Sequence, residues 1–390
     1  MDSVFLKCSF CGEIYSYPHI INTCPKCGGA LLFQYNLDEI KQILIREMLE
    51  DRINSYWKYL ELLPITSLNN AVSLGEVFTP VIELPEKITF NFKHIYAKND
   101  GFLPTLTFKA RGMSIAVSCL KELKVKKVVI PSAGNAAAAL AAYGAKANME
   151  VHVYMPSNAP SSTIKECMFM GANVHLIDGN INDAAKKVSE VKDKYGWFDL
   201  STNKQPYRFE GYKVMAFELA EQFNWKPPEA IIFPTGGGEG VIGLWKGFKE
   251  LSELGWLESE IPRLIIVQSN GCAPLVKAFK ENKDEVEEAW INPETIAAGL
   301  KVPKPYASYL ILRAVRETNG YAVSVSDHEI LNSMKQLARN GLFICPEAAA
   351  THAALPHLYE QGVLDHEDRV LLYFTGNGLK YLDIIDKYFH

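Results

Sequence analysis

Short apolar runs alternate with helix-length segments along most of the chain. The runs are rich in Val and Ile, and each is followed by a segment whose apolar residues recur at helical spacing. The pairs of run and segment are 126–131 with 136–147, 151–155 with 162–170, 173–177 with 182–195, 230–233 with the helix after Gly240, and 264–268 with the helix from Ala273. This alternation predicts an α/β fold of open, mostly parallel sheets wrapped by helices, in which ligands lie beyond the carboxyl ends of the strands.

Two further patterns precede this body. Two pairs of cysteines lie near the N-terminus, and apolar residues at helical spacing then run from Leu37 to Glu61, just before Leu62-Leu63-Pro64. We expect a helix over 37–61 that forms an arm between the cysteine-bearing segment and the body.

Composition and charge narrow the classes of protein. The 390 residues are 48% hydrophobic and 22% charged, which is enough apolar content for two core domains. The net charge of −5 offers no broad basic field, so neither nucleic acid nor an anionic membrane is an expected partner. The first residues lack a charged region followed by an apolar one, and no apolar run reaches about 18 residues, so we expect a cytoplasmic protein without a membrane span.

Four of the eight cysteines form two knuckles, Cys8-x2-Cys11 and Cys24-x2-Cys27. Each knuckle aims two sulfurs at one point, and a second knuckle completes a tetrahedral thiolate shell. The spacing favours a zinc ion, with a metal-free or redox-active pair of knuckles as the alternative. Since four thiolates leave no open coordination position, a zinc ion here is structural.

Lys109 lies in the segment Leu103–Gly112, between Phe108 and residues that open a helical run from Met113. Most lysines are solvated surface charges. A lysine where a loop meets a helix is partly desolvated, and burial lowers the pKa of an ammonium group and frees the lone pair that forms a Schiff base. Lys109 is therefore a candidate Schiff-base lysine.

A glycine-rich turn, Pro234–Gly240, follows the apolar run 230–233 and precedes a helical run from Val241. Clustered glycines let backbone N–H groups converge on an anion, and a helix N-terminus adds a favourable dipole. We interpret the turn as a phosphate cradle, with a tight connection as the alternative. It matches neither the Walker A motif nor the dinucleotide-binding fingerprint.

Two other strand ends carry polar groups. Ser132-Ala133-Gly134-Asn135 lies between a strand and an alanine-rich helix, which suits it to a carboxylate and a polar ring substituent, although a simple helix N-cap has the same pattern. Thr375 follows the run 370–374 and places a neutral hydroxyl at a strand end. A Schiff-base lysine, a phosphate cradle and such a hydroxyl together are the set that a pyridoxal 5′-phosphate enzyme requires.

These segments resemble the threonine synthases and their relatives within the tryptophan-synthase-like, fold-type-II group of pyridoxal phosphate enzymes. The matching segments occur in family order at 57–64, 79–80, 104–112, 132–135, 206–211, 234–240, 346–349 and 375–380. The resemblance implies four parts: a zinc-ribbon-like segment over 1–30, a helical arm over 31–75, a large cofactor-binding domain from 76–112 and 206–390, and a small α/β domain over 113–205.

The resemblance also implies roles for single residues. The implied cofactor contacts are Lys109 and Phe108, Asn135 at the ring hydroxyl, Thr235, Gly236, Gly237, Gly238, Glu239 and Gly240 at the phosphate, and Thr375 at the pyridine nitrogen. The implied substrate contacts are Ser132, Ala133 and Gly134 at the carboxylate and Arg208 at the substrate phosphate, with an exposed salt bridge as the alternative for Arg208.

The implied reaction is that of threonine synthase, in which O-phospho-L-homoserine and water give L-threonine and phosphate. Lys109 is then the catalytic residue, because its amine moves protons at Cα and Cβ. A neutral Thr375 at the ring nitrogen favours elimination and replacement over transamination. The family further implies a homodimer that acts on a small amino-acid substrate.

Four positions depart from the family pattern. Ala110, Ala133, Ala136 and Gly237 stand where the family commonly has Asp, hydroxyl residues and Asn. A hydrogen bond to a charged group is worth about 1.5–3 kcal/mol. Each of these positions therefore lacks a side-chain donor that could help to bind the substrate phosphate. A threonine or serine ammonia-lyase, or a β-replacement enzyme similar to cysteate synthase, is the alternative. A non-catalytic binding protein is a third hypothesis that the presence of Lys109 argues against.

Overall fold

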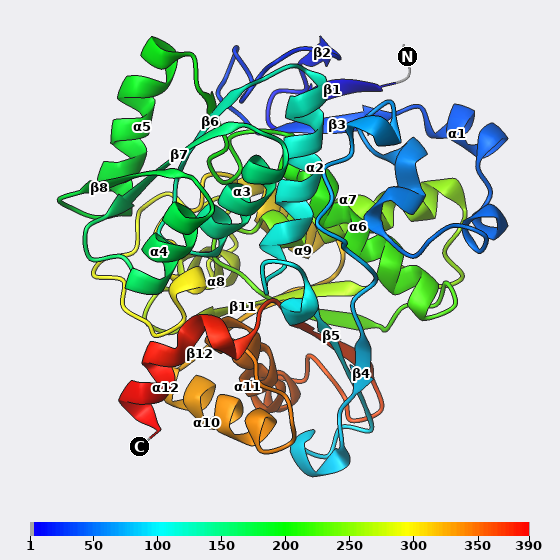
Figure 1. Ribbon diagram of the computed structural model, residues 1–390. Coiled ribbons are helices and arrows are strands. Elements are labelled where there is room, and N and C mark those ends of the chain that lie inside the picture. The colour runs from blue at the N-terminus through cyan, green and yellow to red at the C-terminus, as the bar shows by residue number, and fades with distance from the viewer. Residues whose placement is uncertain (1–3, 390) are drawn as a thin grey trace. The chain divides into compact units, whose positions relative to one another are not determined.

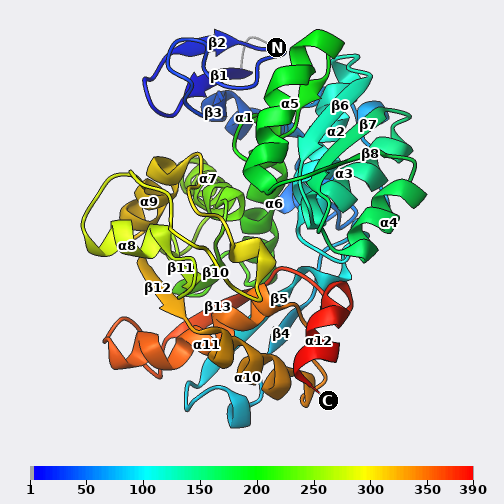
Figure 2. The ribbon, with the colours of Figure 1, turned by 90° about the vertical axis from the view of Figure 1, so that its left-hand side faces the viewer.

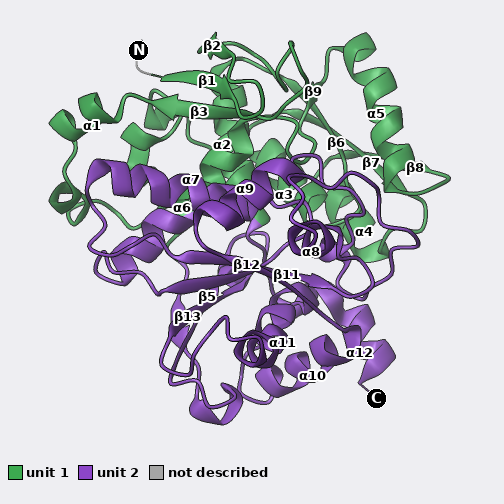
Figure 3. Ribbon diagram, turned by 180° about the vertical axis from the view of Figure 1, so that it is seen from behind, with its two compact units in different colours: residues 1–78, 109–214 green, residues 79–108, 215–390 purple. Residues whose placement is uncertain are grey.

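The computed structural model describes residues 4–389. They form two compact units, coloured separately in Figure 3. Unit 1 contains the chain up to Phe78 and Lys109–Val214, and unit 2 contains Thr79–Phe108 and the chain from Met215 onward. The predicted domain boundaries at residues 76, 113 and 206 stay a prediction.

The N-terminal part of unit 1 is a three-stranded antiparallel sheet in the order β2-β1-β3 (Figure 1). Its strands are β1 (Val4–Cys8), β2 (Ile14–Ser16) and β3 (Leu31–Tyr35). In β1 the buried Leu6 and Cys8 alternate with the exposed Lys7, which is the period-two pattern of a sheet with one buried face. We call residues 4–35 the ribbon.

The continuous helix expected over 37–61 is wrong. The structure has the short helix α1 (Leu37–Ile43), followed by the 3₁₀ turns η1 (Arg46–Leu49), η2 (Tyr56–Leu62) and η3 (Leu68–Asn70). The helix ends where Leu44 and Ile45 are extended, with ψ of 117° and 156°. The buried apolar residues of this segment are Ile40, Leu44, Leu49, Tyr56, Tyr59 and Leu62. At about 100° per residue they fall within one half of a helical wheel, so the pattern suggested one helix, although the backbone is extended at Leu44, Ile45 and Ser55.

The main sheet of unit 1 has four parallel strands in the order β8-β7-β6-β9. The strands are β6 (Lys127–Pro131), β7 (Glu150–Pro156), β8 (Asn173–Ile177) and β9 (Phe198–Asp199), and the helices are α2 (Lys109–Glu122), α3 (Asn135–Lys146), α4 (Ser161–Phe169) and α5 (Ile181–Tyr195). Helix α5 covers one face, where Ala184 and Val188 pack against Val129 and Tyr154. Helices α3 and α4 cover the other face (Figure 2).

The sheet of unit 2 has six strands in the order β12-β11-β10-β13-β5-β4. The strands are β4 (Val81–Glu83), β5 (His94–Asn99), β10 (Ala230–Pro234), β11 (Arg263–Ser269), β12 (Tyr321–Val325) and β13 (Arg369–Phe374). All neighbours pair in parallel except β4, which is antiparallel to β5. The central strands are buried along almost their whole length, as in parallel sheets that are covered on both faces.

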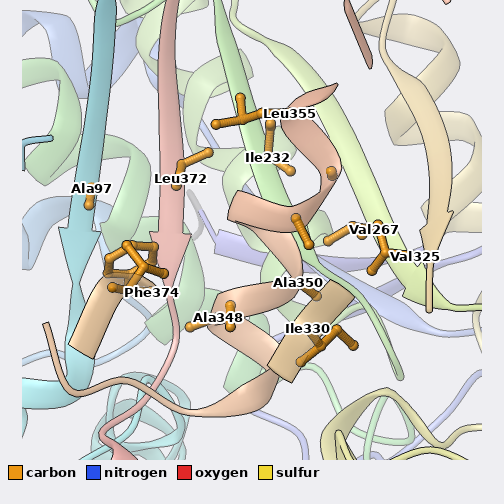
Figure 4. Packing of buried hydrophobic residues seen from close by; sticks show 14 of the residues in the cluster. Ala97, Ile232, Val267, Val325, Ile330, Ala348, Ala350, Leu355, Leu372 and Phe374 are labelled. Carbon is orange, nitrogen blue, oxygen red and sulfur yellow. The ribbon is translucent and has the colours of Figure 1, made fainter. Parts of the chain in front are cut away.

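Helices pack on this sheet. They are α6 (Tyr207–Gln222), α7 (Glu239–Leu254), α8 (Pro274–Lys280), α9 (Ser308–Glu317), α10 (Asp327–Ala338), α11 (Pro346–Glu360) and α12 (Leu382–Tyr388). Helix α6 begins in unit 1 and ends in unit 2. The 3₁₀ turns of this unit are η4 (Glu86–Ile88), η5 (Asp100–Phe102), η6 (Ala298–Leu300) and η7 (Gly378–Tyr381). Ala348, Ala350 and Leu355 of α11 share one apolar cluster with Ile232 and Val267 of the strands (Figure 4). Small side chains on α11 let it approach the sheet closely.

The predicted α/β fold with mostly parallel sheets is confirmed. Expected and observed bounds agree most closely for strands that are set off by clear turns: the run 173–177 is β8, and the run 230–233 lies inside β10. Within residues 4–389, no helix is both long and apolar enough to cross a membrane.

A buried polar network fixes the end of β5. Lys98 Nζ donates to Glu218 Oε2 at 2.7 Å and to the backbone oxygen of Thr79 at 2.8 Å. Asp100 accepts hydrogen bonds from the hydroxyls of Thr79 and Tyr373, at 2.8 and 2.9 Å. Lys98, Glu218 and Asp100 are fully buried, and buried charges are tolerated when they are paired in this way. The network therefore anchors the strand end from which the lysine-bearing loop departs.

Candidate active site

The loop before Lys109 is held against the end of β13. The backbone N–H of Phe108 donates to the backbone oxygen of Thr375 at 2.9 Å, and that of Asn377 donates to the oxygen of Leu106 at 3.0 Å. Leu106 has a φ of 57°, a left-handed conformation that bulky residues rarely adopt. Strained backbone of this kind persists only where its surroundings determine it, and it is frequent at functional sites.

Lys109 is the first residue of α2 and belongs to unit 1. It is half-buried, and its Nζ lies 5.6 Å from the ring centroid of Tyr212. A Cβ added to Gly112 would lie 2.6 Å from the same ring, so glycine at this position lets α2 approach Tyr212. The face of an aromatic ring attracts an ammonium group. Sequence reasoning missed Tyr212, because its proximity to Lys109 depends on tertiary packing.

The glycine-rich turn joins β10 to α7 and leaves no room for side chains. A Cβ added to Gly236 would lie 2.1 Å from the backbone oxygen of Gly299, and one added to Gly240 would lie 2.3 Å from the ring of Phe233. Gly238, the N-cap of α7, has a φ of 80°, which favours glycine. The turn is therefore lined by backbone at the start of a long helix, and such a cradle fits the phosphate of pyridoxal phosphate.

The residues that flank these glycines are also inside unit 2. Thr235 is buried, and its hydroxyl donates to the backbone oxygen of Phe233 at 2.9 Å. Glu239 is buried and is the first residue of α7, whereas Gly237 is half-buried. The Thr235 hydroxyl is thus used within the turn, and backbone N–H groups remain the natural donors to a phosphate.

Thr375 follows β13 and is 5% exposed. Its Oγ1 lies 3.7 Å from Sγ of Cys345, whose backbone N–H donates to the oxygen of Gly376 at 3.0 Å. Burial raises the pKa of the Cys345 thiol, so this sulfur is uncharged at neutral pH. Thr375 therefore offers a neutral hydroxyl beside a neutral thiol.

Glu347, at the start of α11, was only part of a matching segment in the sequence and received no role. Its Oε1 accepts hydrogen bonds from the Gly299 N–H at 2.7 Å and from the Tyr381 hydroxyl at 2.9 Å. Its Oε2 is buried without a hydrogen-bond partner among the described residues. Burial raises the pKa of this carboxyl, although the hydrogen bond from Gly299 opposes the shift. Since Gly299 packs against Gly236, Glu347 supports the back of the glycine-rich turn.

The second turn at a helix start belongs to unit 1. Asn135 is the first residue of α3, and Gly134 is its N-cap. The Ser132 N–H donates to the backbone oxygen of Tyr154 at 3.0 Å. A Cβ added to Gly134 would meet no described atom within 4 Å, and residues 132–135 are all half-buried. This turn is open, which suits a ligand that enters and leaves.

Arg208 lies in the first turn of α6 and is fully buried, so the alternative of an exposed salt bridge is wrong. Its Nη1 donates to the backbone oxygen of Leu200 at 3.0 Å, and its Nη2 donates to the Tyr212 hydroxyl at 3.3 Å. Residues four apart lie on one face of a helix. Tyr212 therefore stands between Lys109 and Arg208, and the i, i+4 spacing from Arg208 was the one signal in the sequence that could have found it.

The positions that depart from the family pattern lie at the two helix starts and the two turns. Ala110 is fully buried in the first turn of α2, and Ala136 is 8% exposed in the first turn of α3. Ala133 and Gly237 are half-buried. A methyl group or a hydrogen at these positions offers no side-chain hydrogen-bonding group.

The four N-terminal cysteines converge. Their Sγ atoms all lie within 4.8 Å of one another, with Cys8 and Cys27 at 3.5 Å and Cys11 and Cys24 at 3.7 Å. A tetrahedron with Zn–S bonds of about 2.3 Å has S···S edges of about 3.8 Å. Burial opposes ionisation of Cys24, yet the Tyr15 hydroxyl at 3.1 Å and nearby backbone N–H groups lower the pKa of this thiol to about 6. The cluster fits a tetrahedral metal site.

The predicted cofactor and substrate residues fall into two groups. Lys109, Ser132, Ala133, Gly134, Asn135 and Arg208 belong to unit 1, and Phe108, Thr235, Gly236, Gly237, Gly238, Glu239, Gly240 and Thr375 belong to unit 2. Within unit 2 the structure brings Phe108 to Thr375 and to Gly240. The peptide bond between Phe108 and Lys109 joins the two groups along the chain.

Comparison with known proteins first gives the class. A family model described as "Pyridoxal-phosphate dependent enzyme" matches residues 72–376, which include the lysine, both turns and Thr375. Among solved structures, threonine deaminase isoform 2 from Solanum lycopersicum aligns with a TM-score of 0.68 at 20% identity, covering 86% of this chain and 94% of that one. Maize serine racemase aligns with a TM-score of 0.66 at 22% identity, covering 80% and 94%. At such identities the likeness concerns the fold, and the class is that of pyridoxal-phosphate-dependent enzymes.

Curated relatives then give the family within this class. The threonine synthase of Methanocaldococcus jannaschii is 37% identical over 378 residues, covering 96% of this chain and 92% of that protein. That of Methanosarcina acetivorans is 37% identical over 382 residues with the same coverage, and that of Halalkalibacterium halodurans is 32% identical over 325 residues, covering 83% and 88%. The chain belongs to the threonine synthase family of pyridoxal-phosphate-dependent enzymes.

Proposed function

We propose that this protein is a threonine synthase, which converts O-phospho-L-homoserine and water to L-threonine and phosphate. The observation that supports this most strongly is the 37% identity to threonine synthases over 96% of the chain. The packed glycine-rich turn agrees with it, because this turn fits a cofactor phosphate. The buried Arg208 also agrees, since it is a cation suited to a substrate phosphate.

Specific residues would hold pyridoxal phosphate. Lys109 would attach its aldehyde carbon, Asn135 would meet its ring hydroxyl and Thr375 its ring nitrogen. The backbone of residues 235–240 would bind its phosphate, and Phe108 would contact it beside the lysine. When bound, the cofactor supplies an electron sink that makes protons on the neighbouring substrate carbons easier to remove.

Lys109 also moves protons. Its released amine would take protons from Cα and Cβ of the substrate, return one to Cα and give one to Cγ, which becomes the methyl group when the phosphate has left. The ring of Tyr212, 5.6 Å from Nζ, stabilises the ammonium form and limits where it can move. The neutral hydroxyl of Thr375 would meet the ring nitrogen without supplying a full counter-charge, which would suit elimination and replacement better than transamination.

The open turn and Arg208 bind the two ends of the substrate. Backbone N–H groups of Ser132, Ala133 and Gly134, at the N-terminus of α3, would receive the carboxylate. Arg208 would receive the phosphate, for which the planar guanidinium offers two parallel donors.

A second function is favoured by the alanines at the helix starts. Ala110, Ala133 and Ala136 offer no polar side chain to a second phosphate. An enzyme with these residues suits a smaller substrate, such as threonine or serine, whose elimination would release ammonia and a keto acid. A β-replacement enzyme similar to cysteate synthase is the related possibility.

A substrate screen decides between these functions. Purified protein with pyridoxal phosphate is supplied with O-phospho-L-homoserine, L-threonine, L-serine or O-phospho-L-serine, and phosphate, threonine and keto acids are measured together. Equimolar phosphate and threonine from phosphohomoserine support the synthase. Formation of 2-oxobutanoate from threonine, without phosphate release from phosphohomoserine, would replace it with the lyase.

We propose a structural zinc ion at Cys8, Cys11, Cys24 and Cys27. Support comes from the sulfur separations, which match a tetrahedron of zinc thiolates. Metal analysis should find about one zinc per chain in the native protein and none in Cys24→Ser. Retained turnover at saturating substrate in folded Cys24→Ser protein is expected of a structural ion, and abolished turnover would contradict that role.

We also propose that the protein is a homodimer and that it is located in the cytoplasm. The dimer rests on resemblance to the family, and light scattering of the purified protein tests it. None of the eight cysteines, all of which lie within residues 4–389, forms a disulfide, as expected in a reducing compartment. Fractionation of cells that express the protein tests the location.

A further inference from the structure

The ribbon contacts the segment that leads into α6, within unit 1. Asn22 of the ribbon donates through Nδ2 to the backbone oxygens of Asp199 at 2.6 Å and Lys204 at 3.1 Å. One side chain thus ties both ends of the loop 199–204. Between these ends lies Leu200, and its backbone oxygen is the one that receives Arg208 Nη1.

A second contact joins the ribbon to α6 itself. The hydroxyl of Tyr35, the last residue of β3, donates to Glu210 Oε2 at 2.6 Å. The same oxygen pairs with Lys213 Nζ at 2.6 Å, and Nζ lies 3.9 Å from the centroid of the Tyr35 ring. The side chains of Glu210 and Lys213 are fully buried, so this ion pair depends on its hydrogen-bonding partners. Tyr35 is therefore part of a closed cluster two residues after Arg208.

Aromatic packing fills the space between these two contacts. Phe33 of β3 lies 5.7 Å from the ring of Tyr207, which immediately precedes Arg208, and 5.0 Å from the ring of Tyr17. Tyr207 is fully buried. Tyr207 and Glu210 thus contact the ribbon directly, and Arg208 contacts the loop 199–204, which Asn22 of the ribbon holds.

The cysteine cluster lies close to these contacts along the chain. Asn22 precedes the ligand candidate Cys24 by two residues, and Cys24 N–H donates to the backbone oxygen of Gly29 at 2.9 Å, which closes the knuckle. The ribbon buries Leu6, Leu31 and Phe33, but it has only three short strands, and small domains of this size commonly use a metal to fix their shape. The state of the cysteine cluster therefore decides how firmly Asn22 and Tyr35 are held.

We propose that the ribbon positions Arg208, with Asn22 and Tyr35 as the positioning residues, and that loss of its metal weakens phosphate binding without removing the cofactor. The inference rests on the proposed function for the role of Arg208 as the phosphate-binding group. Neither residue touches a reacting atom; each acts through the loop 199–204 or through Glu210.

Two substitutions with matched controls test the positioning role. Asn22→Ala removes the tie to the loop 199–204, and Asn36→Ala removes the same group from an exposed helix cap just outside the ribbon. Tyr35→Phe removes one hydroxyl from the Glu210 cluster. Tyr17→Phe removes a hydroxyl that donates instead to the backbone oxygen of Pro64.

The expected result is a separation of KM from kcat. Asn22→Ala should raise the KM for O-phospho-L-homoserine and the Kd for inorganic phosphate about tenfold, and Tyr35→Phe about threefold, with kcat within about twofold of the parent. Bound cofactor, measured by its absorbance, should be unchanged, and backbone hydrogen exchange in residues 199–213 should become faster. Both control variants should match the parent in all five measurements.

Removal of the metal tests the same inference without any substitution. A chelator that strips the metal from the holoenzyme should raise the phosphate Kd and speed hydrogen exchange in 199–213, and added zinc should reverse both changes. An unchanged phosphate Kd and unchanged exchange in metal-free protein, or in both Asn22→Ala and Tyr35→Phe, would overturn the inference. If the parent protein releases no phosphate from phosphohomoserine, the proposed function fails, whereas hydrogen exchange and inorganic phosphate binding still test the ribbon.

Discussion

Two turns in this protein each join a parallel strand to the start of a helix but differ in packing. The turn before α7 is closed, because a Cβ at Gly236, Gly238 or Gly240 would lie within 2.3 Å of a neighbouring atom. The turn before α3 is open, because a Cβ at Gly134 would meet no described atom within 4 Å. A cofactor that stays bound suits a turn whose shape is fixed before binding, whereas a substrate that must leave suits an open one.

The largest effect is expected from Lys109→Ala, which should abolish turnover but leave the closed turn intact. Turnover should fall by more than about 10³-fold, because both the attachment of the cofactor and the proton transfers are lost. If the closed turn is a complete phosphate site, the variant should still bind pyridoxal phosphate without a covalent bond. Equilibrium dialysis measures the binding, and borohydride followed by peptide mapping checks that the label on residue 109 is lost. Lys121→Ala, at the other end of α2, is the control and should keep both properties.

Gly236→Ala should break the closed turn. The added methyl group would collide with the backbone oxygen of Gly299, and overpacking of this kind costs about 1–3 kcal/mol of unfolding free energy or more. Cofactor affinity should fall along with stability. Urea denaturation and cofactor titration of Gly236→Ala and of Gly134→Ala, which has open space at the Cβ position and a φ of −151°, separate this collision from the general effect of losing a glycine.

Glu347 sharpens the comparison, because it supports the closed turn from behind. Glu347→Ala leaves the Gly299 N–H without its partner, at a cost of about 1–3 kcal/mol, whereas Glu347→Gln keeps an acceptor oxygen. The difference should appear in both the unfolding free energy and the affinity for pyridoxal phosphate. Equal losses in the Ala and Gln variants would mean that the carboxyl acts through its charge instead.

The same residue predicts a dependence on pH. Burial raises the pKa of Glu347 in the folded protein above its ordinary value of 4.5. Between the unfolded and the folded pKa, the folded protein therefore keeps a proton that the unfolded chain releases. The stability of the parent relative to Glu347→Gln is therefore greatest below the unfolded pKa and falls as the pH rises through the folded pKa. Denaturation curves of the two proteins at a series of pH values measure this relative stability. An increase in the stability of the parent relative to Glu347→Gln with rising pH would contradict the raised pKa.

Gly134→Ala should have the smallest effect on folding. Gly134 has a φ of −151°, which any residue adopts, and the space for a methyl group is open. The unfolding free energy should change by less than about 0.5 kcal/mol. The KM should rise severalfold, because the methyl group lies where the substrate carboxylate is proposed to bind. A stability loss as large as that of Gly236→Ala would show that the two turns are packed alike.

Local patterns in the sequence predicted these turns and the strands beside them. A short apolar run such as 173–177, bounded by turn residues, can be recognised as a strand from its own sequence. A glycine-rich turn can be recognised in the same way, because its glycines adopt backbone conformations that other residues avoid. Strand β5 carried no such evidence. It contains Lys98, and a lysine inside a central strand is possible only because Glu218, far along the chain, is paired with it.

The candidate site divides in the same way. Lys109 and the glycines were found because their chemistry is tied to short motifs. Tyr212 and Glu347 were missed because a tyrosine in a helix and an acid at a helix start are ordinary in sequence, and only tertiary contacts bring them to Lys109 and to Gly299. The helix expected over 37–61 failed since apolar residues there are buried by irregular turns.

The pairing of β5 with β13 has a consequence for synthesis on the ribosome. Asp100, at the end of β5, accepts a hydrogen bond from Tyr373 of β13, and these residues are 273 positions apart. At about 5–20 residues per second, the nascent chain carries β5 without β13 for tens of seconds. All residues of unit 1 have by then been made, since its last segment ends at Val214. The nascent chain should therefore be most prone to aggregate, and most dependent on chaperones, between the completion of unit 1 and the arrival of β13.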